Sequence, residues 1–81
     1  MGDQFSRTIR AYAGGANPHI SINSVSEAAA HIAALPEPRR QKLHWQLAQR
    51  TVEEAGKWPG GTDLTELAMR NALATDGNKV E

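Results

Sequence analysis

The sequence contains no cysteine, which excludes disulfide bonds and thiolate chemistry within this chain. Aromatic residues are scarce as well, with one phenylalanine, one tyrosine and two tryptophans among 81 residues. Nine Lys and Arg balance nine Asp and Glu, so the chain lacks the excess positive charge that is typical of a general polyanion binder. No apolar run approaches the roughly 20 residues that span a bilayer. These absences favour a soluble, cytoplasmic protein with no membrane partner.

The apolar residues that are present predict a small core. Thirteen alanines accompany 19 larger apolar side chains, and each alanine contributes little buried surface. The length fits a single small α+β domain over residues 1–81, with 1–4 and 77–81 expected to be flexible. Because small domains often need an added source of stability, a second copy of the chain is one way to complete such a core.

Alternating apolar and polar residues predict two strands near the amino terminus. The first spans Phe5–Tyr12 and places Phe5 and Ile9 on one face; the second spans His19–Asn23. Turn-forming residues at 13–18 separate them, so the two strands should form an antiparallel hairpin. A lone hairpin is marginal in water, so its apolar face should pack against helices.

Three helices are expected after the hairpin. Ser24 and Glu27 match a capping box, which starts the first helix. The second helix should cover 38–57, and the third, capped by Thr62 or Asp63, should end near residue 76. The order ββααα predicts an α+β fold in which an N-terminal two-stranded antiparallel hairpin packs on three helices. The buried positions expected on the last two helices are Leu43, Leu47, Ala48, Val52 and Ala55, and Leu64, Leu67, Ala68, Ala72 and Leu73.

Residues that could carry enzyme chemistry do not converge in the sequence. The three histidines, at positions 19, 31 and 44, lack the spacings that build a metal site. Glu53 and Glu54 are adjacent, so a helix would point their carboxylates about 100° apart, which is poor geometry for acid–base catalysis. No glycine-rich phosphate loop occurs. We therefore expect no enzymatic activity, no cofactor and no metal.

The second predicted helix carries its charges in unfavourable places. Arg39, Arg40 and Lys42 lie at its amino end, and Glu53 and Glu54 lie near its carboxyl end, against the helix dipole in both cases. One explanation is a nucleic-acid-binding segment at 39–45, in which Arg39, Arg40 and Lys42 contact phosphates and the nearby Trp45 stacks on a base.

A second explanation is a protein–protein contact, which the absence of catalytic motifs favours as the function. Two copies of the helix could pair antiparallel about a two-fold axis near Leu47, so that Arg40 of each copy faces Glu54 of the other. Trp45 would then lie close to the axis, where aromatic residues are favoured. The alternative for Trp45 is that it packs inside its own chain. The sequence thus predicts a non-enzymatic interaction module that binds a protein partner or itself.

The segments SVSEAAAHI, LPEPRR and KLHWQLAQ, followed by ELAMRNAL, resemble domain-of-unknown-function family 982 of small proteobacterial proteins. The resemblance covers roughly 50 residues from Ser24 onward. It implies a small bacterial α+β domain and supplies no activity, ligand or catalytic residue.

Overall fold

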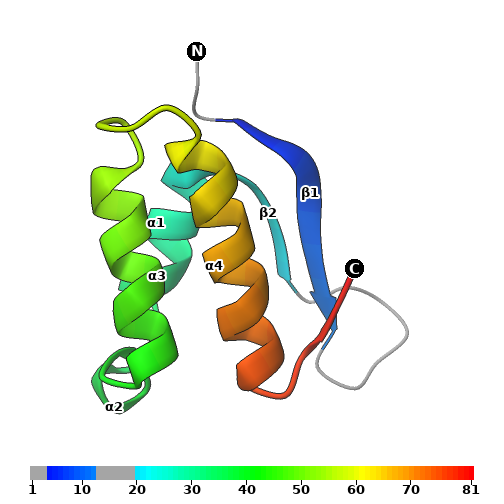
Figure 1. The fold of residues 1–81 in the computed structure, drawn as a ribbon. Helices are drawn as coiled ribbons and strands as arrows, with labels where there is room; N and C mark the ends of the chain where they lie inside the picture. The colour runs from blue at the N-terminus through cyan, green and yellow to red at the C-terminus, as the bar shows by residue number, and fades with distance from the viewer. Residues whose placement is uncertain (1–3, 13–19) are drawn as a thin grey trace.

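The computed structural model describes residues 4–12 and 20–81 and arranges them as a sheet with helices packed against it (Figure 1). The elements in chain order are β1 (Gln4–Tyr12), β2 (Ile20–Ser24), α1 (Val25–Ala33), α2 (Glu37–Arg40), α3 (Leu43–Glu54), α4 (Gly61–Thr75) and β3 (Lys79–Val80). The strand order is β2-β1-β3, and both neighbours run antiparallel to β1. The α+β class is confirmed, but the described residues form three strands and four helices instead of two and three.

The two predicted strands pair as an antiparallel sheet whose apolar face lies in the core. Ile9 is opposite Ile22, and both side chains are buried, together with Phe5 and Ala11. The pairing register shifts between Gln4 and Ile9, so the strict alternation expected for β1 is interrupted and Arg7 is exposed. The turn expected at 13–18 lies outside the described residues.

The carboxyl-terminal segment forms the third strand, where the sequence analysis expected a loose tail. Lys79 pairs with Tyr12 and Val80 with Ala11. The backbone N–H of Glu81 donates to the carbonyl of Arg10 over 2.9 Å. These bonds cover an edge of β1 that would otherwise present unpaired backbone groups to solvent. Too little alternation occurs in so short a segment for the sequence to reveal the strand.

The first helix begins as its capping box predicts. The Glu27 backbone N–H donates to the Ser24 hydroxyl oxygen over 3.1 Å, and the Glu27 carboxylate accepts from the backbone N–H of Asn23 over 3.0 Å. The helix buries Ala28 and Ile32 against the rest of the core. This helix lies against β2 and α3.

The second predicted helix is wrong as a single element, because the chain breaks between α2 and α3. Gln41 closes α2, and Lys42 takes an extended conformation (φ −63°, ψ 142°) from which α3 starts. The Lys42 carbonyl accepts the first bonds of the new helix, from Trp45 and Gln46. The break lets α3 take the direction in which the indole of Trp45 is buried, and burial of a large side chain contributes about 1.5–3 kcal/mol. No side-chain cap marks Lys42 as a helix start, so sequence alone does not show the break.

Small residues line the contact between α3 and α4. Ala48 and Thr65 are fully buried there, and the Thr65 hydroxyl lies within 3.1 Å of the Thr51 carbonyl oxygen. A Cβ on Gly61 would lie 2.2 Å from the backbone oxygen of Ala55, so only glycine allows this approach. Helix α4 therefore starts at Gly61, directly after Gly60, whose φ is +79°. The start predicted at a cap on Thr62 or Asp63 is wrong.

Within residues 4–12 and 20–81, the helices are too short or too polar for any of them to cross a membrane.

Candidate functional site

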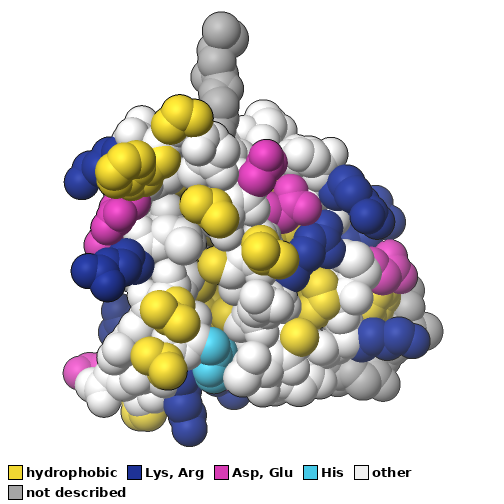
Figure 2. All heavy atoms as spheres, viewed as in Figure 1, with side chains coloured by type: hydrophobic (Ala, Val, Ile, Leu, Met, Phe, Trp, Pro, Cys, Tyr) yellow, Lys and Arg dark blue, Asp and Glu magenta, His cyan; other side chains and the backbone are white. Residues whose placement is uncertain are grey.

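Two features of the helical layer stand out as candidates for function. The first is a face of exposed apolar side chains, which we call the leucine face and define as Leu43, Leu47, Trp58, Leu64 and Leu67. Each of these side chains is more than half exposed, from 52% for Leu47 to 69% for Leu43. They come from α3, α4 and the connection between them. Figure 2 shows apolar side chains spread over the side of the molecule on which α3 and α4 lie in Figure 1.

The leucine face contradicts the buried stripes expected from the sequence. Leu43 and Leu47 were expected in the core of α3, and Leu64 and Leu67 in the core of α4. The expected positions Ala48, Ala72 and Leu73 are buried, and Trp45 and Met69 fill the core in place of the four leucines.

A hollow of about 390 Å³ lies beside part of the leucine face and is lined by Trp58 and Leu64. It lies between the end of α3 and the start of α4. Arg50 and Glu54, which form an ion pair over 3.6 Å, lie on its wall. The lining residues are Arg50, Thr51, Glu54, Trp58, Gly61 and Leu64.

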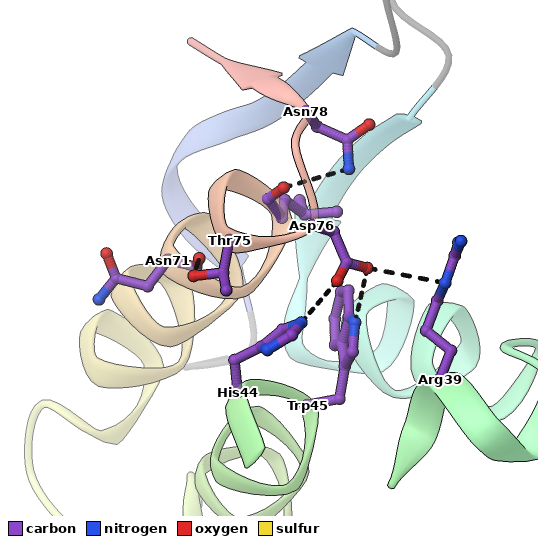
Figure 3. A network of polar contacts seen from close by, with 8 residues as sticks. Arg39, His44, Trp45, Asn71, Thr75, Asp76 and Asn78 are labelled. Carbon is purple, nitrogen blue, oxygen red and sulfur yellow. Dashed lines mark hydrogen bonds and ion pairs between the residues drawn. The ribbon is translucent and has the colours of Figure 1, made fainter. Parts of the chain in front are cut away.

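The second feature is a polar cluster around the Asp76 carboxylate at the end of α4 (Figure 3). His44 Nε2 donates to Asp76 Oδ1 over 2.6 Å, and Trp45 Nε1 donates to Asp76 Oδ2 over 2.8 Å. Arg39 approaches the same carboxylate at 3.8 Å. The cluster therefore joins the end of α4 to the start of α3 and to α2.

The Asp76 cluster favours the ionised carboxylate. Burial of the Asp76 carboxyl raises its pKa, but hydrogen bonds from Trp45 and His44, with the positive charges of His44 and Arg39, outweigh this and lower the pKa below its ordinary value. This anion lies beside the first turn of α3, which has no acidic residue of its own. The contact thus offsets part of the unfavourable charge arrangement seen in the sequence.

His31 packs against Trp45, one of the residues that bond to the Asp76 carboxylate. Its ring centroid is 5.6 Å from that of Trp45, and the His44 centroid is 5.7 Å from the same indole. Burial lowers the pKa of His31. The charge of Asp76 raises this pKa, and the charge of Arg39 lowers it further. Among the described residues, no three or more His, Asp or Glu side chains are placed to hold a metal ion.

The basic residues singled out in the sequence are separated by the break in the helix. Arg39 and Arg40 lie in the last turn of α2, where a positive charge is favourable, and only Lys42 remains at the amino end of α3. Arg40 lines an open hollow of about 670 Å³ with Glu37 and other polar residues. Lys42 is exposed.

The acidic residues at the other end of α3 are also on the surface. Glu53 accepts from Gln49 over 3.0 Å, and Glu54 pairs with Arg50. The basic residue Lys42 and the acidic residues Glu53 and Glu54 therefore lie at opposite ends of α3 and do not contact each other within one chain.

Of the two alternatives left open for Trp45, the structure agrees with packing inside its own chain. Trp45 is 1% exposed, which removes it from both proposed surfaces. A base could not stack on it unless it left the core. Sequence reasoning missed Asp76 as its partner, because 31 residues separate them and nothing local links the two.

No family model matches the chain, and neither a curated protein nor a solved structure matches it. The resemblance to domain-of-unknown-function family 982 therefore stays a prediction.

Proposed function

We propose that this chain is a small non-enzymatic protein–protein interaction module and that the leucine face is its binding surface. The observation that carries the proposal is the exposure of large apolar side chains on α3, α4 and their connection. The two helices bury Trp45, Met69 and Leu73 with several small residues, while four leucines and Trp58 face solvent. Several large apolar side chains exposed on one side of a small protein are typical of a binding surface.

The face has the composition of an interface centre with a polar rim. Its apolar side chains lie on two packed helices and include Trp58, an aromatic residue of the kind enriched at binding hot spots. Charged residues surround them, including Lys42, Arg50 and Glu54. An interface built in this way binds through its apolar centre, and the rim charges set orientation and specificity.

The Asp76 cluster supports this function indirectly. Its hydrogen bonds fix the start of α3 against the end of α4, so the two helices that carry the leucine face keep a defined geometry. Binding surfaces on rigid elements lose less conformational entropy on association.

The nucleic-acid alternative has less support in the described residues. Arg39 is paired with Asp76, and the expected stacking residue Trp45 is buried. Arg40 and Lys42 alone give few phosphate contacts, and each contact contributes modestly to affinity.

The test replaces two leucines of the face by a polar residue of similar size, in the double variant L47Q/L64Q. Tagged wild type is used to capture proteins from an extract of the host, and its self-association is followed by sedimentation velocity. The wild type should bind a protein partner or itself, and L47Q/L64Q should lose that binding by at least tenfold.

The matched control is Gln49→Lys, a half-buried position on α3 outside the leucine face. It should bind as the wild type does. Binding that survives in L47Q/L64Q, or a wild type that captures nothing and stays monomeric, would contradict the proposal.

A further inference from the structure

The outer side of α3 has a spacing that suits pairing with another copy of itself. Leu43, Leu47, Arg50 and Glu54 follow one another at intervals of four, three and four residues. At 100° per residue they fall within an arc of about 60°, while Trp45 points to the opposite side of the helix. Because the spacing reads the same in both directions, a two-fold axis between Leu47 and Arg50 superimposes the set on itself.

The two ends of this stripe differ in shape and complement each other. The amino end presents the exposed side chain of Leu43, which extends from the surface with little of its area covered. The carboxyl end carries the 390 Å³ hollow between α3 and α4. In an antiparallel pair, Leu43 of each copy lies opposite Glu54 of the other, beside that hollow. Leu43 of one copy therefore lies over the hollow of the other copy.

The charges at the two ends are complementary as well. Arg40 and Lys42 give the amino end a positive charge, and neither has an ion-pair partner among the described residues. At the carboxyl end Glu54 is paired with Arg50, and Glu53 has no ion-pair partner among the described residues. An antiparallel arrangement brings opposite charges together at both ends, whereas a parallel one would bring like charges together.

We infer that the occupant of the leucine face is a second copy of this chain. The two α3 helices pack antiparallel, and Leu43 of each copy enters the hollow of the other, against Trp58 and Leu64. Leu47 of each copy packs on the aliphatic stem of Arg50 of the other. This inference rests on the proposed function, because it names the partner of the same surface. It differs from the pairing expected from the sequence, since Trp45 takes no part and the axis lies slightly beyond Leu47.

The absence of cysteine makes site-directed crosslinking a direct test. Two single variants, Leu43→Cys and Glu54→Cys, are made with tags of different size and mixed with a short bismaleimide. The mixture should give the crosslinked pair 43–54 between chains. Leu43→Cys alone should crosslink at least tenfold less, because the two copies of position 43 are about 16 Å apart along the helix axis, at 1.5 Å per residue.

The control mixture pairs Leu43→Cys with Gln49→Cys, which lies on a different side of α3. It should crosslink no more than Leu43→Cys alone. Efficient crosslinking of Leu43→Cys with itself would overturn the antiparallel register, and equal crosslinking in all mixtures would show random collision and overturn the inference.

Sedimentation separates failure of this inference from failure of the proposed function. Wild type should show a concentration-dependent dimer that L47Q/L64Q lacks. A wild type that stays monomeric at about 1 mM, a thousandfold above a micromolar dissociation constant, overturns the second-copy inference. If such a monomer still captures a different protein through the leucine face, the proposed function stands and only the second-copy inference fails. If capture is absent too, both fail.

Discussion

The two sides of α3 use large side chains in opposite ways. On the inner side, Trp45 is buried and its indole N–H is bonded to Asp76. On the outer side, Leu43 and Leu47 are mostly exposed and contribute little to the core. One helix therefore carries a side that stabilises the fold and a side that is free to bind. The difference predicts that substitutions on the inner side reduce stability, whereas those on the outer side reduce association.

The largest expected effect comes from the inner side. Trp45→Ala removes a fully buried indole and should lower the free energy of unfolding by about 3–5 kcal/mol, through lost burial and the cavity left behind. In a domain of this size, such a loss consumes much of the total stability. Urea unfolding followed by circular dichroism measures it.

Trp45→Phe serves as the control, because it keeps much of the apolar volume and removes only the indole N–H donor. It should cost less than Trp45→Ala. A loss below about 1 kcal/mol for Trp45→Ala, the level of many surface substitutions, would break the comparison between the two sides.

A smaller loss is expected when the polar anchor of the inner side is changed. Asp76→Asn replaces a carboxylate that accepts from His44 and Trp45 with an amide, whose NH₂ group faces a donor in either orientation. The cost should be about 1–3 kcal/mol near pH 7. Because the pKa of Asp76 is lowered on folding, this contribution is complete above about 3.8 and is lost as the pH falls through the folded value.

Asp63→Asn is the matched control for charge removal, since Asp63 is exposed and accepts a 3.3 Å bond from the Ser6 hydroxyl. It should change stability by less than about 0.5 kcal/mol. Equal losses for the two variants, measured by urea unfolding, would show that the Asp76 cluster does not anchor α3.

The stability contributed by the inner side should also depend on pH, because His31 packs against Trp45. Burial lowers the pKa of His31 from its ordinary 6.5, so the folded protein favours the neutral ring. The stability that this provides is complete above about 6.5 and is lost as the pH falls from there towards the folded value. His31→Gln should therefore give a flatter stability profile between pH 7.5 and 5, as thermal unfolding would show. Parallel profiles for the two proteins would contradict this.

Local signals in the sequence predicted the parts of the fold that depend on neighbours. The first helix begins at Ser24 because Ser24 and Glu27 satisfy each other's backbone groups within one turn. The burial of Ile9 and Ile22 agrees with the apolar face that alternation predicted for each strand. Both features depend on residues close in the chain or on a simple period.

The parts that were not predicted depend on contacts between distant segments. The break at Lys42 has no capping residue and exists because Trp45 is buried against residues near Asp76. Periodicity placed Leu47 and Leu64 inside, since it does not show that Trp45, Met69 and Leu73 fill the core instead. The leucine face was therefore missed, although Leu47, Glu53 and Glu54 were singled out from the charges and spacing of this helix.

The smallest effect on stability tests the central claim, that the leucine face serves binding and not folding. The free energy of unfolding of L47Q/L64Q is compared with that of wild type by urea denaturation at a protein concentration low enough to keep both monomeric. The account predicts a difference within about 0.5 kcal/mol for each position, as for other surface substitutions. A loss of about 2–5 kcal/mol for each leucine, the cost of emptying a core position, would show that these leucines are packed within the fold and would contradict the account.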